Sequence, residues 1–158
     1  MPLEPLPLDA NGLYILLENI GYENSFHWGF YLATSSSDGY IIHMTYNEAT
    51  TAWIFEEKLT SDVGNSPSLL VAVKIAVVEQ TLQHHLVSRL RSANRHLPAL
   101  TCRTWLMNAL KELDDEGYIS LIKSARFIEG ECIQAAATNY RSRARLQTAS
   151  SQFKTFVN

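Results

Sequence analysis

The strongest pattern along the chain is a helical stripe that begins at residue 102. Its apolar members are spaced three and four positions apart, which places them on one face of a helix. They are Cys102, Trp105, Leu106, Ala109, Leu110 and Leu113. Thr101 suits the N-cap, although Leu100 or Ala99 could also begin the helix, and Gly117 suits the position just past its end. The pattern therefore predicts a helix from Cys102 that ends within 114–117.

The first third of the chain instead has the short apolar runs and the alternation that are typical of strands. Residues 13–17 form an apolar run, and in residues 26–32 large apolar residues alternate with the others. The Ser-rich segment 34–39 has the composition of a hairpin loop, and strand-like sequence resumes at 40–45. With 52–55 as a third strand of this group, the pattern predicts a small antiparallel sheet.

The remaining segments are mostly helical in pattern. Residues 69–76 are rich in Val and Ile, which favours a strand, but the first turns of a helix are an alternative. Leucine or valine recurs every fourth residue over 78–92, which predicts a helix. Residues 118–127 suit one more strand or helix, and 129–145 is predicted to be helical. We therefore expect an α+β protein, with a small antiparallel sheet packed against helices.

Composition narrows the class of protein. The chain has 158 residues, 46% hydrophobic and 18% charged, which is typical of a globular domain and not of a disordered chain. We expect one domain over 1–158, with an extended Pro-rich lead-in at 1–11, a core at 12–117 and a C-terminal helical extension at 118–158. Thirteen Lys and Arg against 16 Asp and Glu leave no positive excess for phosphates, so nucleic acid is not an expected partner.

The sequence lacks several features of membrane and secreted proteins, and this bears on its expected cellular location. No apolar run approaches the roughly 20 residues that span a bilayer, so no transmembrane segment is expected. The first residues lack the pattern of a signal peptide. Two cysteines, Cys102 and Cys132, do not make a disulfide framework. These features predict a cytoplasmic protein.

The candidate chemistry centres on Cys102 with His27 and His43. A thiolate is the reactive form of cysteine, and the first turn of a helix favours it through unpaired backbone N–H groups and the helix dipole. The same N–H groups can hold a developing oxyanion. A histidine on a neighbouring strand can take the thiol proton and later deliver it to a leaving group, while a third polar group orients the imidazole.

The hairpin register decides whether the two histidines meet. If the hairpin turns about its Ser-rich centre, His27 lies opposite or near Thr45, and His43 is a diagonal neighbour on the same face. A slip by one residue would place the histidines on opposite faces. Structural interpretations stand beside the catalytic one, because cysteine is among the most buried residue types and either histidine could be a satisfied strand residue.

Three pieces of the sequence carry a family resemblance. They are Phe26-His27-Trp28-Gly29-Phe30-Tyr31-Leu32, Gly39-Tyr40-Ile41-Ile42-His43-Met44 and Thr101-Cys102-Arg103. In this order they resemble the circularly permuted papain-like fold of the NlpC/P60 superfamily, in its lecithin:retinol acyltransferase-like branch. The resemblance implies that His27 is the general base, His43 its orienting partner and Cys102 the acyl-accepting nucleophile. The Cys-Arg-X-Trp piece is also similar to a group of fungal domains whose second strand often lacks the histidine.

The residues and the resemblance together predict a cysteine-nucleophile enzyme. It would perform acyl transfer, amide or ester hydrolysis, or a related cyclisation on a small apolar molecule, without a metal or other cofactor. The residues expected to contact the substrate are Trp28, Tyr40, Arg103 and Trp105, and Arg103 could bind a carboxylate bidentately. One alternative is a non-catalytic binding module that kept the fold. Another is a small-molecule tailoring enzyme that uses His27 and His43 as acid and base.

Other polar residues are interpreted as structural. Glu56 and Glu57 have the pattern of a solvated strand end. His84 and His85 point to different sides of their helix and cannot face one site. Cys132 follows two acidic residues, Glu129 and Glu131, which disfavour a thiolate. The arginines at 141, 143 and 145 suit a solvated helix face, or contact with an acidic partner or an anionic lipid surface.

Overall fold

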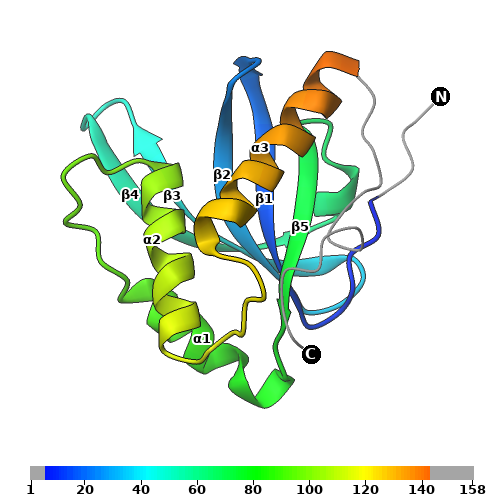
Figure 1. The fold of residues 1–158 in the computed structure, drawn as a ribbon, viewed down its shortest axis with the longest axis vertical. Helices are drawn as coiled ribbons and strands as arrows, with labels where there is room; N and C mark the ends of the chain where they lie inside the picture. Colours follow the sequence, from blue (N-terminus) through cyan, green and yellow to red (C-terminus); the bar gives the residue numbers. More distant parts are fainter. Residues whose placement is uncertain (1–5, 143–158) are drawn as a thin grey trace.

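A computed structural model describes residues 6–142 as a five-stranded antiparallel sheet with helices packed against it (Figure 1). The strand order is β4-β3-β2-β1-β5. The strands are β1 (Gly12–Tyr22), β2 (Ser25–Ala33), β3 (Asp38–Asn47), β4 (Ala52–Ser61) and β5 (Leu69–Val77). The helices are α1 (Gln83–Arg91), α2 (Cys102–Asp115) and α3 (Ala125–Ser142). The expected α+β class is confirmed.

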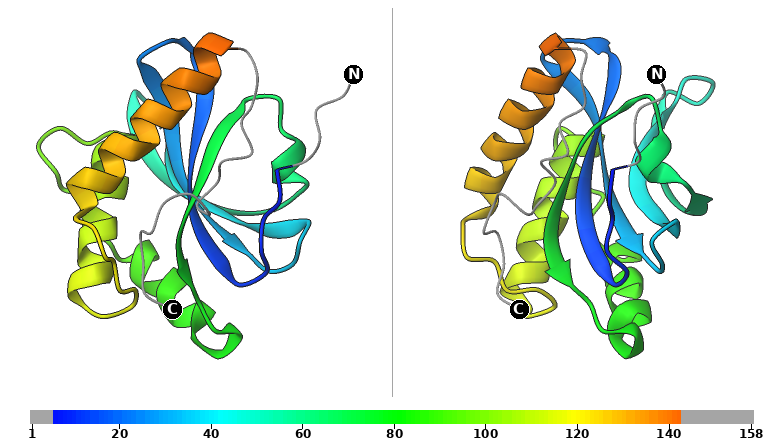
Figure 2. Two further views of the ribbon diagram at one scale, coloured as in Figure 1. Left: turned by 45° about the vertical axis from the view of Figure 1, so that its right-hand side comes forward. Right: turned by 90° about the vertical axis from the view of Figure 1, so that its right-hand side faces the viewer.

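The predicted strands are present, and most of them extend beyond the predicted limits. The ambiguous segment 69–76 is strand β5, and nearly all of its side chains are buried. A strand covered on both faces is continuously apolar, which explains why its sequence shows no alternation. Residues 6–8 cover the sheet on the face away from α2 and α3 (Figure 2).

The helix predicted from the apolar stripe is confirmed as α2. Thr101 accepts a hydrogen bond from the backbone N–H of Thr104 (3.1 Å), and the Thr104 hydroxyl accepts one from the backbone N–H of Thr101 (2.8 Å). This reciprocal capping box fixes the start of the helix at Cys102. Gly117 follows the helix with φ +81°, a conformation that glycine adopts without strain. All six residues of the predicted stripe are buried.

The starts of two predicted helices are wrong, since the helix expected from residue 129 begins at Ala125, and the element expected over 118–127 is largely absent. The helix expected over 78–92 begins only at Gln83, after a short 3-10 turn at Gln80–Leu82. Val78 is not helical, because its N–H donates to the carbonyl of Asn11 (2.8 Å), while the Gln83 amide donates to the carbonyl of Val78 (3.0 Å). The segment 118–127 forms turns and no regular strand or helix until α3 begins at Ala125.

Helix α3 packs against β5 and β1, and it contributes Ile128, Cys132 and Ala136 to the same core as α2. Helix α3 therefore shares the core with α2. The end of the predicted helix 129–145, with Arg143 and Arg145, lies outside the described residues, as does the first part of the expected lead-in. In residues 6–142 no helix combines the length and the apolar character needed to cross a membrane.

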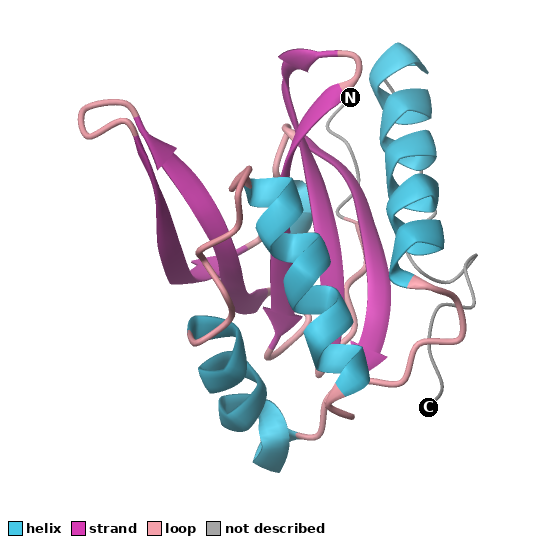
Figure 3. Cartoon of the chain, turned by 60° about the vertical axis from the view of Figure 1, so that its left-hand side comes forward, coloured by secondary structure: helices cyan, strands magenta, loops and turns pink. Residues whose placement is uncertain are grey.

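The sheet separates two clusters of buried side chains. On the helix side, Phe26, Trp28 and Phe30 of β2 pack with Cys102 and Trp105. On the other side, the alternate residues of β2 face residues 6–8. Strands β2 and β3 pair only from Phe30 to Ala33, and beyond that point the β3–β4 hairpin leans away from the rest of the sheet (Figure 3). This divergence opens the sheet beside His27.

Candidate functional site

His27 and His43 form a direct pair across the opening between β2 and β3. Nε2 of His27 lies 2.7 Å from Nδ1 of His43, and the rings meet edge to face at 4.8 Å between centroids. The last printed pair of the ladder is Phe30–Ile42. Continuing that register places His27 opposite Thr45, with His43 diagonal to it on the same face. The register expected from the Ser-rich turn is therefore confirmed.

Gly29 makes room for this pair. A Cβ atom at residue 29 would lie 3.3 Å from Cβ and 3.6 Å from Nδ1 of His43. A side chain at this position would lie tightly against Cβ of His43 on the neighbouring strand, which must give by a few tenths of an ångström. The Gly of the His-Trp-Gly sequence thus allows β3 to approach closely at His43.

Glu56 extends the pair into a relay of three residues. Nε2 of His43 donates to Oε1 of Glu56 at 2.8 Å. With both rings neutral, this hydrogen bond makes Nδ1 of His43 an acceptor, so Nε2 of His27 is the donor. The remaining nitrogen of His27, Nδ1, then carries a lone pair that can accept a proton. Among the described residues it has no hydrogen-bond partner.

The sequence analysis missed Glu56, which it interpreted as part of a solvated strand end. A signal was present in the sequence. The turn between β3 and β4 pairs Asn47 with Ala52, and counting back from that pair brings Glu56 opposite His43. Directly opposite residues of an antiparallel pair share a face and are in contact. Extending the predicted strand 52–55 by one residue would have found this partner.

Burial controls the charge of His27. Its pKa is lowered from 6.5 to about 4, first by burial and then by the neighbouring His43, while the carboxylate of Glu56 acts in the opposite direction. An imidazole with such a pKa is neutral at pH 7. His27 is therefore available as a proton acceptor in the resting protein.

Cys102 lies at the start of α2, as predicted, but on the helix side of the sheet. Its side chain is buried, and burial raises the pKa of its thiol. The backbone N–H groups of Trp28, Arg103 and Cys102 itself act in the opposite direction, as does the charge of Arg103. The backbone N–H groups at the helix start thus favour the thiolate as expected, but burial has the larger effect and the pKa of the thiol is raised.

The structure brings the two histidines together without joining them to the thiol. Among the described residues no hydrogen bond links Cys102 to His27 or His43. The backbone N–H of Trp28, which hydrogen-bonds to the sulfur, belongs to the peptide bond that follows His27. The thiol therefore lies beside the His27–Trp28 peptide, while the imidazoles lie on the opposite face of β2.

The residues expected to contact substrate are placed in three different environments. Trp28 and Trp105 are 2% and 0% exposed and fill the helix-side core, where Trp105 packs edge to face on Phe30 and Phe55. Arg103 forms an ion pair with Glu129 (2.8 Å), so its guanidinium has a carboxylate partner already. Tyr40 is 38% exposed and lines a groove on the far side of α1.

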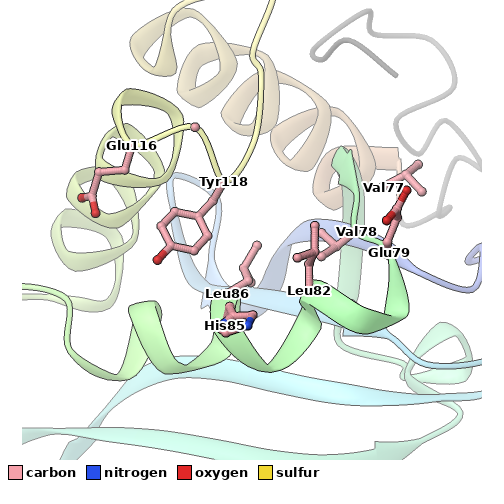
Figure 4. A pocket seen from close by; sticks show the side chains of 9 residues that line it. Val77, Val78, Glu79, Leu82, His85, Leu86, Glu116 and Tyr118 are labelled. Atoms are coloured by element: carbon pink, nitrogen blue, oxygen red, sulfur yellow. The ribbon is translucent and has the colours of Figure 1, made fainter.

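Two grooves flank α1, and neither includes the histidine relay. One, of about 640 Å³, lies between α1 and the segment after α2, with Tyr118 and Glu116 on one side and Leu82, His85 and Leu86 on the other (Figure 4). The second, of about 530 Å³, includes Tyr40 and His84. His84 and His85 thus line different grooves, as their predicted orientations require.

The structure also describes the surroundings of Cys132, of Arg141 and of the side chains that could bind a metal. Burial and two nearby glutamates raise the pKa of Cys132, which is fully buried. Arg141 forms an ion pair with Glu23 (3.3 Å). Within residues 6–142, no three His, Cys, Asp or Glu side chains are arranged to hold a metal ion.

The comparisons with known proteins give a family but no activity. No curated protein and no solved structure matches the chain. One family model, described as a family of unknown function, matches residues 11–156, which include every strand and helix described above. The chain therefore belongs to DUF6914, a family of unknown function.

Proposed function

We propose that this protein is a cysteine-nucleophile enzyme that transfers or hydrolyses an acyl group on a small apolar molecule. Cys102 is the nucleophile, His27 the general base, and His43 with Glu56 the orienting groups. The observation that carries the proposal is the hydrogen-bonded relay from His27 through His43 to Glu56. Such a relay fixes the tautomer of the base and stabilises its imidazolium form.

The proposed reaction has two half-reactions, and both use the same groups of the protein. His27 Nδ1 takes the proton of the Cys102 thiol, and the sulfur attacks the carbonyl carbon of the substrate. Backbone N–H groups at the start of α2 donate to the oxyanion that develops. His27 then gives its proton to the leaving group, which departs as a thioester forms on Cys102. Water or another acceptor repeats the sequence and releases the acyl group.

The proposal requires a change of side-chain orientation. In the resting structure the thiol is buried beside the His27–Trp28 peptide and has no hydrogen bond to the imidazole. The two groups are near neighbours at the point where β2 and β3 stop pairing. Because the thiol and the imidazole lie on opposite faces of β2, joining them when substrate enters requires the His27–Trp28 segment to turn at this opening together with the two side chains.

The permuted papain-like fold is part of the same proposal. Two observations support it: the chain order of a histidine strand, a second histidine strand and a cysteine helix, and the position of the α2 start beside the first of these strands. The paired imidazoles and the five-stranded antiparallel sheet agree with the resemblance to the NlpC/P60 superfamily.

A second candidate function uses the histidines alone as acid and base, with the cysteine structural. The raised pKa of the Cys102 thiol and its lack of a hydrogen bond to either histidine favour this candidate. The two candidates differ in whether a covalent intermediate forms on Cys102.

The test is a search for an acyl-enzyme. The full chain is incubated with p-nitrophenyl esters of increasing acyl length, and its intact mass and the released nitrophenolate are followed. We expect an added acyl mass on the peptide that contains Cys102, and loss of turnover in Cys102→Ala and His27→Ala. Cys132→Ala is the matched control and should keep activity. Full turnover by Cys102→Ala would overturn the nucleophile proposal. If His27→Ala alone were inactive, the second candidate would be supported.

A further inference from the structure

We propose that Glu18 of β1 is a further positioning residue of the relay, and that Glu18 and Glu56 bracket the two imidazoles so that the neutral pair can take up and hold one added proton. The proposal deepens the proposed function, on which it rests for the role of His27 as the base. The positioning of a proton on the histidine pair can nevertheless be measured without any turnover.

The four side chains form a row across four neighbouring strands. Glu18 on β1 is the register partner of His27 on β2. His27 is hydrogen-bonded to His43 on β3, and His43 is the register partner of Glu56 on β4. Register partners share a face of the sheet, with Cβ atoms about 5 Å apart. The row therefore reads carboxylate, imidazole, imidazole, carboxylate.

Glu18 and the histidines line one small hollow together with Leu16, Gly29 and Ile41. The apolar members of this hollow exclude water from the inner side of the row. Burial raises the pKa of Glu18, and the charge of His43 lowers it. The second effect places Glu18 within electrostatic reach of His43, with which it lines this hollow.

Among the residues that the structure describes, no lysine or arginine is paired with Glu18. On this face of the sheet, Lys58 stands opposite Ile41 on β4, and Lys74 on β5 forms an ion pair with Asp9 (2.9 Å). The imidazoles are therefore the groups whose positive charge Glu18 can stabilise.

The arrangement of these four side chains explains why the histidine pair takes up one added proton and not two. Two imidazoles in hydrogen-bond contact repel each other when both are charged, and this repulsion contributes to the low pKa of His27. A single proton shared by the pair is stabilised from the β4 side by Glu56 and from the β1 side by Glu18. During the proposed reaction, Glu18 would thus favour retention of the proton that leaves the thiol until it is delivered to the leaving group.

The test is an NMR titration of the histidine ring signals in the full chain. Glu18→Gln keeps the shape of the side chain and removes its charge. Glu48→Gln, in the exposed turn between β3 and β4, is the matched control for the same loss of charge. We expect proton uptake by the His27–His43 pair to shift to lower pH by about one unit in Glu18→Gln. In Glu48→Gln it should not change.

Glu18→Asp keeps the charge, and its titration midpoint should stay close to that of the wild type. Equal midpoints for Glu18→Gln and Glu48→Gln would overturn the proposal, as would an Asp variant that shifts as far as Gln. If Glu18→Gln fails to fold, the Asp variant and the response of the wild-type midpoint to salt decide between charge and shape. Because the readout is proton binding, failure here is distinguishable from a failure of the nucleophile proposal, which concerns turnover and Cys102.

Discussion

His43 and Glu56 stand directly opposite each other on β3 and β4, and the 2.8 Å hydrogen bond between them turns a strand histidine into the middle of a relay. The carboxylate of Glu56 is 46% exposed, whereas the His43 side chain is 12% exposed. An ion pair with one exposed partner adds little to stability. Its main consequence is therefore the fixed tautomer of His43, and through it that of His27.

Replacing Glu56 by Gln should impair the proposed reaction more than it impairs folding. A Gln amide can donate as well as accept, so the tautomer of His43 is no longer fixed. Loss of such an outer partner typically costs about 10–100-fold in activity. We expect a fall in kcat/KM of this order with a nearly unchanged melting temperature. Glu57→Gln is the control, because Glu57 binds Arg91 instead of the relay (2.6 Å). Equal effects of the two variants would contradict the role of Glu56.

Adding a methyl group at Gly29 should separate the two imidazoles. The new Cβ would lie 3.3 Å from Cβ of His43, so His43 must move by a few tenths of an ångström and carry its ring with it. Overpacking of a buried contact costs about 1–3 kcal/mol. Gly130→Ala is the matched control, since nothing lies within 4 Å of its added Cβ in α3 and alanine favours the helix. Urea unfolding should show Gly29→Ala destabilised and Gly130→Ala unchanged or stabilised. A stable Gly29→Ala with unaltered histidine titration would contradict the packing argument.

The sequence was informative where a local pattern determines the structure. The α2 stripe and its Thr101 cap follow from spacing. The Ser-rich turn placed His27 beside His43 only on the condition that the hairpin turns about its centre, and the structure has that register. Glu56 was missed because the predicted β4 ended one residue too early. The start of α1 was misplaced because Val78 bonds to Asn11, a contact between segments far apart in the chain.

The environment of Cys102 could not be predicted from spacing. A helix start lowers the pKa of a thiol only if solvent or a charge also stabilises the thiolate. Whether β2 covers the sulfur depends on how α2 packs on the sheet, and here burial is the larger effect. The same packing places Trp28 and Trp105 in the core and leaves Tyr40 at a separate groove.

The stability of the protein should fall with acid over the range in which His27 titrates. Its pKa is lowered from 6.5 to about 4 in the folded state, so the unfolded chain binds the proton more tightly. The contribution of neutral His27 is complete above about pH 6.5 and is lost as the pH falls to about 4. Chemical unfolding of wild type and His27→Gln across this range isolates the effect. We expect the free-energy difference between the two proteins to change with pH by about 1–2 kcal/mol, after allowance for partial exposure of the ring. A difference independent of pH would show that His27 is not held neutral by the fold.

The two thiols should differ in how they react with iodoacetamide. Cys102 is 7% exposed and burial raises the pKa of its thiol, so alkylation should be slow at pH 7 and accelerate at alkaline pH as the thiolate forms. Cys132 is fully buried and should react only when the protein unfolds. Mass spectrometry of the two cysteine peptides over time gives both rates, with the urea-unfolded chain as the reference.

If substrate entry brings the thiol and the imidazole together, a non-hydrolysable substrate analogue that leaves the sulfur uncovered should accelerate alkylation of Cys102 at pH 7 and leave Cys132 unchanged. Rapid alkylation of Cys102 at pH 6 in the free protein would instead show that the thiolate–imidazolium pair already exists at rest, and that burial does not control this cysteine.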